Sequence, residues 1–241
     1  MKNMLMLPIL ALNLMVTEFA LAGTMGPDIT SKNWTGFYAG ANGGAGLATA
    51  ASAINIGLPG ATSGTNSFSI ASHELNGFLA GGQAGYNYQH QNLIFGLEGD
   101  GNWTNIQGTA PCLAILSCRA NIRWTADASA RLGVLPTNGL LVYAKGGVAW
   151  TGVNYSLGNA LILETTIISS NQSLTKTGGL IGIGTEYLLA PHWTAKIEYN
   201  YADYGTHANN FLIKGASDPI NLPVSTTLQM HGIKVGVNYL I

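Results

Sequence analysis

The chain has 241 residues, of which only 9% are charged, whereas soluble domains typically carry about 25%. Glycine is abundant, with 32 residues, and the formal net charge is −1 at pH 7. A chain without a basic surplus is not expected to bind nucleic acid or an anionic surface through its overall charge.

The first residues have the features of a secretory signal peptide. Lys2 forms a short positive region, Met4–Val16 is apolar, and Ala20-Leu21-Ala22 before Gly23 resembles a cleavage site. The apolar run is shorter than the ~18 residues of a membrane-spanning helix. We therefore predict a signal peptide at residues 1–22 and a single mature domain at residues 23–241.

The segment Thr177–Tyr204 contains the clearest pattern in the chain. Apolar residues occupy alternate positions between Ile181 and Leu189, and the alternation resumes from Trp193 to Tyr201. Side chains of a strand point to opposite faces with a period of two, so this segment predicts a hairpin with one apolar and one polar face. The polar face carries full charges, and the apolar face carries aromatic residues near its ends. This combination is typical of a wall between lipid and a polar lumen.

The same alternation recurs along the mature chain and predicts eight strands of about 11 residues, joined alternately by short turns and long polar loops. A membrane-spanning chain without long apolar helices must close into a barrel. The predicted fold is all-β, an eight-stranded antiparallel transmembrane up-and-down β-barrel. Its strands are expected at Trp34–Gly46, Glu74–Tyr88, Leu93–Trp103, Ala120–Val134, Leu140–Val153, two within Thr177–Tyr204, and Leu228–Ile241. Its long loops are expected at Leu47–His73, Thr104–Arg119, Asn154–Thr175 and Gly205–Thr226.

Aromatic residues on the outward positions are expected to form one girdle at each membrane interface. In the fourth strand, Ile122 and Trp124 are predicted to face out and Arg123 to face in. The girdle near the short turns would contain Phe37, Tyr86, Tyr88, Tyr187, Trp193 and Tyr239, and the girdle near the long loops would contain Trp103, Trp124, Trp150 and Tyr201.

Ten charged residues share the inward parity of the predicted strands, five acids and five bases. A barrel of about eight strands has an interior only wide enough for side chains, and buried charges there must be paired. We therefore expect a neutral charge network that fills the lumen, and a narrow, gated small-solute pore is the alternative. The predicted network consists of Glu98, Asp100, Arg123, Asp127, Arg131, Lys145, Glu186, Lys196, Glu198 and Lys234.

The sequence gives little indication of a metal site or a catalytic site. Cys112 and Cys118 lie in a predicted extracellular loop of an oxidising compartment, so a disulfide is expected, and no histidine nearby supports a metal site. His207 lies close to Asp203, but no nucleophile motif accompanies them. We predict no catalytic residue, no metal and no cofactor.

Several segments together resemble the porin family of small, OmpA-like outer-membrane barrel proteins. The matching runs are W-T-G-F-Y-A-G-A-N-G-G-A-G from Trp34, G-F-L-A-G-G-Q-A-G-Y-N-Y-Q from Gly77, I-F-G-L-E-G-D from Ile94, R-L-G-V-L from Arg131, Y-A-K-G-G-V-A-W from Tyr143, the hairpin above, and H-G-I-K-V-G-V-N-Y from His231. The resemblance implies an eight-stranded barrel that the barrel-assembly machinery inserts and that displays antigenic surface loops. The family pattern usually ends in an aromatic residue, whereas this chain ends in Ile241, with Tyr239 as the nearest aromatic.

The expected location is the Gram-negative outer membrane, with extracellular loops and both termini in the periplasm. The expected role is that of a structural surface antigen in contact with outer-membrane lipid and lipopolysaccharide. The alternatives are a small-solute porin and an adhesin that binds a host or matrix ligand through its loops.

Overall fold

In the computed structural model of the protein, the residues described are 33–56, 66–113, 116–157, 161–162, 166–167, 171–213 and 220–241. The predicted signal peptide, residues 1–22, lies outside the described residues.

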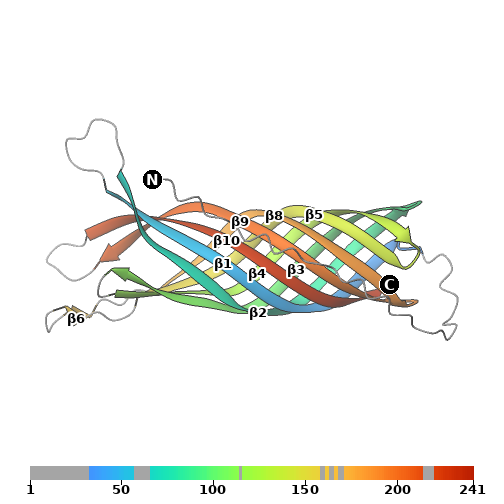
Figure 1. The fold of residues 1–241 in the computed structure, drawn as a ribbon, viewed down its shortest axis with the longest axis horizontal. Coiled ribbons are helices and arrows are strands. Elements are labelled where there is room, and N and C mark those ends of the chain that lie inside the picture. Colours follow the sequence, from blue (N-terminus) through green and yellow to red (C-terminus); the bar gives the residue numbers. More distant parts are fainter. Residues whose placement is uncertain are drawn as a thin grey trace, which may run out of the picture.

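Eight long strands form a closed antiparallel barrel (Figure 1), which confirms the predicted fold class. Around the barrel the strands follow the order β1, β10, β9, β8, β5, β4, β3, β2, so that β1 pairs with both β10 and β2. β6 (Leu161–Ile162) and β7 (Thr166–Ile167) form a separate two-stranded sheet. The barrel strands are β1 (Gly36–Ile56), β2 (Asn66–His90), β3 (Leu93–Leu113), β4 (Leu116–Thr137), β5 (Leu140–Leu157), β8 (Asn171–Ala190), β9 (Trp193–Ile213) and β10 (Ile220–Leu240).

No helix in the described part of the chain has the length and apolar character needed to cross a membrane.

The strands are longer than predicted at the long-loop end, so most of each predicted loop is strand. β1 and β2, for example, remain paired from Gly36 opposite Asn87 to Ile56 opposite Asn66, across the predicted loop Leu47–His73. The outward residues of this extension, such as Thr49, are exposed and lack an apolar pattern. Strand prediction relied on apolar alternation, which is lost where a strand leaves lipid although its hydrogen-bond ladder continues.

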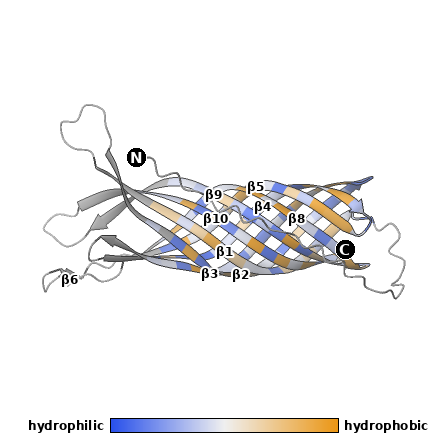
Figure 2. Ribbon diagram, in the orientation of Figure 1, coloured by the Kyte–Doolittle hydropathy of each residue, from blue (hydrophilic) through white to orange (hydrophobic). Residues whose placement is uncertain are grey.

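The outer wall carries a broad apolar belt, and hydrophobic and hydrophilic residues alternate along the strands (Figure 2). Aromatic pairs lie at the short-turn end of the belt, where Phe37 contacts Tyr86 and Trp193 contacts Tyr239. At the other end, Trp103 is 78% exposed and pairs in the ladder with Trp124. The two predicted girdles therefore lie on exposed or half-buried outward positions.

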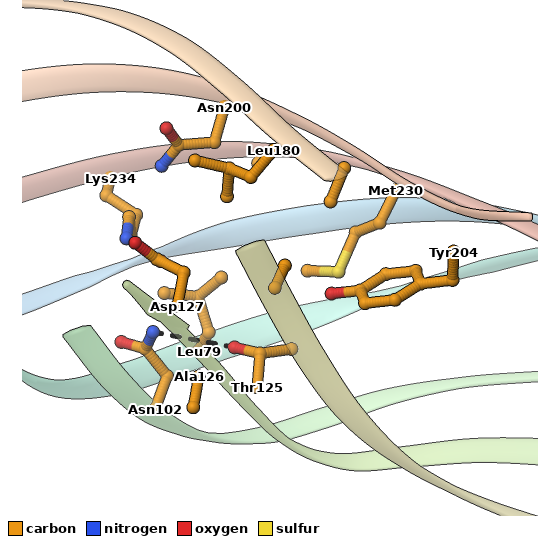
Figure 3. Close-up of a pocket in the computed structure, with 13 residues that line it drawn as sticks. Leu79, Asn102, Thr125, Ala126, Asp127, Leu180, Asn200, Tyr204, Met230 and Lys234 are labelled. Atoms are coloured by element: carbon orange, nitrogen blue, oxygen red, sulfur yellow. Dashed lines mark hydrogen bonds between the residues drawn. The ribbon is translucent and has the colours of Figure 1, made fainter. Parts of the chain in front are cut away.

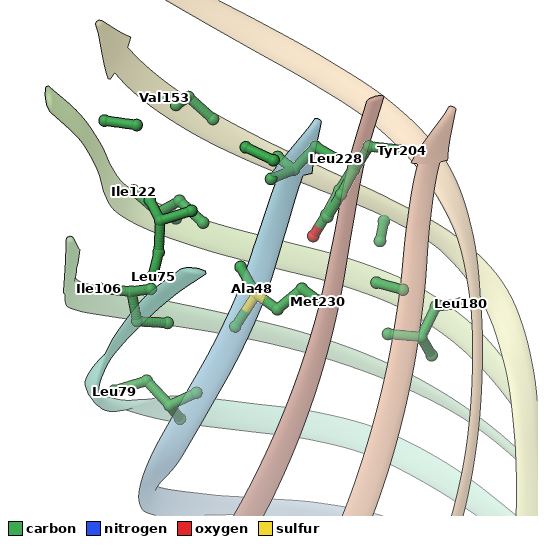
Figure 4. Packing of buried hydrophobic residues seen from close by; sticks show 14 residues of the cluster. Ala48, Leu75, Leu79, Ile106, Ile122, Val153, Leu180, Tyr204, Leu228 and Met230 are labelled. Carbon is green, nitrogen blue, oxygen red and sulfur yellow. The ribbon is translucent and has the colours of Figure 1, made fainter. Parts of the chain in front are cut away.

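The interior is filled by three layers of side chains. An apolar layer lies at the short-turn end and a second, larger one at the long-loop end (Figure 4), with a charged layer between them. β3 crosses all three layers, from Ile94 through Glu98 and Asp100 to Ile106. The short-turn layer contains Trp34, Tyr38, Ile94, Leu135, Leu141, Tyr143, Leu188 and Leu240. The long-loop layer contains Ala48, Ala50, Leu75, Leu79, Ile106, Ala120, Ile122, Ala149, Val153, Leu180, Ala202, Tyr204, Leu228 and Met230.

Candidate functional site

The charged layer of the lumen brings together nine of the ten residues predicted for it. They come from six different strands, and their side chains are almost entirely shielded from solvent. The nine are Glu98 and Asp100 on β3, Asp127 and Arg131 on β4, Lys145 on β5, Glu186 on β8, Lys196 and Glu198 on β9, and Lys234 on β10.

Two glutamates, Glu98 and Glu198, are the centres of the network. The carboxylate of Glu98 lies 3.2 Å from Lys145 Nζ, 3.3 Å from Lys196 Nζ and 3.6 Å from Arg131 Nη1. The carboxylate of Glu198 lies 2.9 Å from Lys145 Nζ, 3.7 Å from Lys196 Nζ and 3.5 Å from Lys234 Nζ. Lys145 and Lys196 therefore each bridge both glutamates, which compensates for the desolvation of all four groups.

The two aspartates are held at the side of the layer that faces the long loops. Lys234 Nζ lies 3.0 Å from Asp100, which also accepts hydrogen bonds from Asn42 and Asn102. Asp127 lies 3.6 Å from Lys145 Nζ and accepts a hydrogen bond from Ser129. Amide and hydroxyl donors thus satisfy carboxylate lone pairs that the ammonium groups do not reach.

Arg131 lies at the side of the layer that faces the short turns. Its guanidinium lies 4.5 Å from the ring centre of Tyr38 and 5.2 Å from that of Tyr143, and its Nη1 is 3.3 Å from Glu186. The rings have room because the neighbouring strands carry glycine. A Cβ at Gly85 would come within 2.3 Å of Tyr38 Oη, and a Cβ at Gly184 within 2.6 Å of the Tyr143 ring.

Tyr38 and Tyr143 also donate hydrogen bonds to the central glutamates, at 2.9 Å to Glu98 and 2.7 Å to Glu198. The aromatic layer and the charged layer are therefore joined by direct hydrogen bonds.

Arg123 was predicted to belong to this network, and that prediction is wrong. Arg123 is exposed on the outside of the barrel, whereas its neighbour Ile122, predicted to face out, is fully buried. The cause is a β-bulge: β4 pairs with β5 through Ile122 opposite Val153 and Trp124 opposite Gly152, which leaves Arg123 as an extra residue. An extra residue reverses the inside–outside parity of the strand beyond it, which alternation alone could not reveal.

Lys176 is a further buried cation, which was not among the residues predicted for the lumen. It lies on β8, on the long-loop side of Leu180, and it is only 2% exposed. Its Nζ donates a hydrogen bond to the backbone oxygen of Thr226 at 3.2 Å. The signal was available, because Lys176 continues the inward parity of Gly182, Gly184 and Glu186, but the strand was predicted to begin after it.

A small cavity lies where the charged layer meets the long-loop apolar layer (Figure 3). Its volume is about 40 Å³, with Asn102, Asp127 and Lys234 toward one end and Tyr204 and Met230 toward the other. A site of this size and polarity has room for a few water molecules. It is too small for a nutrient-sized solute.

Among the described residues, no group of three or more His, Cys, Asp or Glu side chains is arranged to hold a metal ion. Cys112 and Cys118 lie on the facing strands β3 and β4, but their side chains lie outside the described part of the structure, so the disulfide stays a prediction.

Comparison with known proteins agrees with the geometry. Residues 10–239 match the model of a family described as outer membrane protein beta-barrel domain. The 31 kDa outer-membrane immunogenic protein of Brucella melitensis biotype 1 is 32% identical over 169 residues, which cover 68% of this chain and 66% of that protein, less than two thirds of its length. The 22 kDa outer membrane protein of Rhizobium leguminosarum bv. viciae is 26% identical over 174 residues, covering 71% of this chain and 65% of that protein.

Among solved structures, the outer membrane protein OprG from Pseudomonas aeruginosa has a similar fold. The TM-score is 0.51 at 17% sequence identity, with 89% of this chain and 100% of that chain covered. The closed barrel, its apolar outer belt and the match over nearly the whole sequence lead to one conclusion: the chain belongs to the outer membrane protein β-barrel domain family and is an outer-membrane β-barrel protein.

Proposed function

We propose that this protein is a non-catalytic structural barrel with a closed lumen, which anchors four long hairpins at the cell surface. The observation that carries the proposal is the filling of the lumen by a charged layer between two apolar layers. A conducting channel needs a continuous path for water and ions, and a dry apolar constriction blocks such a path. Two such layers lie in series here.

The filled lumen is proposed to be neutral overall. The nine-residue layer contains five carboxylates and four cations, and the buried Lys176 supplies a fifth positive charge. Because buried charge in a small barrel must be compensated, the balance supports a role in stability rather than in ion selection. Arg123 does not take part, although it was predicted to do so.

The test of the closed lumen is a planar-bilayer recording on the refolded protein. We expect no large, steady conductance steps, because buried apolar side chains of the described residues occupy the lumen in both layers. A mobility difference between unboiled and boiled protein on a gel is the control that the barrel has folded. Steady steps from protein that passes this control would show that the protein is a small-solute porin.

A second proposed function, the display of ligand-binding hairpins, is supported by the length of the strands. On β9, the outer wall changes from Tyr199 and Tyr201 to Asp203, and the strand continues to Ile213. The paired strands therefore continue well beyond the apolar belt. The Brucella relative is named an immunogenic protein, which is consistent with surface exposure of such hairpins.

This display requires the long hairpins to face outward and both termini to face the periplasm. We expect an epitope inserted within residues 57–65 to be detected by antibody on intact cells, and the same epitope at Asn138-Gly139, in a short turn, to be detected only after permeabilisation. The reverse result would reject the proposed orientation. Deletion of each long hairpin, followed by binding to host cells or matrix, then tests the adhesin role.

A further inference from the structure

Two arginines lie on the outer wall of β4, above the belt. Arg119 and Arg123 are exposed, and the other described cations, Arg131, Lys145, Lys176, Lys196 and Lys234, are buried in the lumen. Among residues whose burial the structure describes, the outward positive charge is therefore concentrated on one strand.

The height of these arginines on the wall is defined by their neighbours. Arg123 directly precedes the exposed Trp124 in the sequence and lies on its long-loop side, and Trp124 pairs with Trp103 on β3. Trp103 is the last large apolar residue that faces out on β3 before the exposed Asn105 and Gln107. Tryptophan marks the interface between hydrocarbon and headgroups, so Arg123 lies at the level of the headgroups.

The bulge makes this arrangement possible. Without the extra residue, the parity of β4 would place Arg123 inside and Ile122 against lipid. Instead Ile122 completes the apolar layer in the lumen, and the guanidinium of Arg123 is left at the membrane surface.

Nothing in the described structure neutralises the pair. Arg119 donates a hydrogen bond to Gln107, and neither arginine lies within 4 Å of a carboxylate in the described residues. The outward acids in the described part of the chain lie elsewhere: Glu74 is on β2, with β3 between it and β4, and Asp203 on β9 accepts hydrogen bonds from Gly205 and Gln229. The two guanidinium groups are thus available to an external anion.

We propose that the basic patch, defined as Arg119, Arg123, Asn105 and Gln107, binds the phosphate groups of lipid A in the outer leaflet, while Trp103 and Trp124 contact its acyl chains. Guanidinium groups bind phosphate through paired, charge-assisted hydrogen bonds, and the two amides supply further polar contacts. The chain as a whole carries no positive surplus, so the attraction is local. The proposal rests on the outward orientation of the long hairpins.

The test measures lipid retention by refolded protein in detergent, using native mass spectrometry. The probes are bisphosphorylated lipid A, the same lipid without its phosphates, and phosphatidylglycerol. The double variant Arg119→Gln with Arg123→Gln is compared with the control Thr49→Gln with Thr175→Gln, which changes exposed positions at the same end of β1 and β8. The gel mobility shift confirms that each variant folds, and the single variant Arg123→Gln replaces the double one if that variant does not fold.

We expect the double arginine variant to retain about tenfold less bisphosphorylated lipid A than the native protein, the size of effect that loss of a charged hydrogen bond produces. The control variant should retain the native amount, and lipid A without phosphates should bind weakly to all three proteins. Equal retention by native protein and double arginine variant would overturn the proposal. So would equal retention of phosphatidylglycerol and lipid A by the native protein. Because the assay contains no cell, an error in the proposed orientation would appear only in the epitope experiment.

Discussion

Replacement of Lys145 by methionine is expected to lower the free energy of unfolding by about 3–5 kcal/mol, the usual result of removing one partner from a buried ion network. Lys145 Nζ lies within 4 Å of Glu98, Asp127 and Glu198, and its side chain is fully shielded from solvent. Glu98 and Glu198 keep other cations after the change, but the ion pair that the described structure shows for Asp127 is with Lys145. Asp127 would therefore be left as an unpaired buried charge.

The measurement is urea unfolding of the refolded protein in detergent or vesicles, followed by tryptophan fluorescence. Arg123→Met is the matched control, because it removes a cation that lies outside the network, and we expect it to change stability by less than about 0.5 kcal/mol. The double variant Lys145→Met with Asp127→Asn should recover part of the loss, since it removes the stranded carboxylate as well. An unfolding midpoint of Lys145→Met equal to that of the native protein would show that the network is hydrated and weakly coupled.

The second large effect is expected from a charge placed in the long-loop apolar layer. Ile106 is fully buried on β3 and belongs to the long-loop apolar layer, which we propose closes the lumen. Ile106→Asp would place a carboxylate among apolar side chains without a cation partner, and we expect a loss of roughly 3–5 kcal/mol. If the layer is dry, the variant will lose stability or fail to fold.

The next residue, Gln107, provides the control. It is exposed on the outer wall, so Gln107→Asp is expected to change stability by less than about 0.5 kcal/mol. Both variants are measured by the same urea titration, with the gel mobility shift as the test of folding. Equal effects of the two substitutions would contradict the layered lumen and would favour a water-filled interior, as the porin alternative requires.

Much of the barrel wall could be read from alternation alone. Along β10, Ile233, Val235 and Val237 are exposed, and Lys234 between them is buried, as predicted. The same holds for β9, where Lys196 and Glu198 face the lumen. A wall between lipid and a polar interior forces strict alternation, so the sequence within the belt carries nearly complete information on which side each residue faces.

The predictions were wrong outside the apolar belt, where strict alternation is no longer required. Outside the belt both faces tolerate polar or small residues, so the continuing strands beyond Leu47 and the buried Lys176 were missed. The two apolar layers were also missed. Ile106 lies in a segment that was predicted to be a loop, and Leu228 begins a predicted strand, so only pairing shows that the two residues meet in one layer.

The sequence by itself determined the barrel, the apolar belt with its aromatic girdles, and nine of the residues that meet in the lumen, since each follows from the period of a strand in lipid. The tertiary structure decided the rest. Only the register between β4 and its neighbours shows the bulge that moves Arg123 outside, and only closure of the sheet joins charges from six strands into one network of ion pairs. Alternation is a local property of one strand, whereas register and closure depend on contacts between residues far apart in the chain.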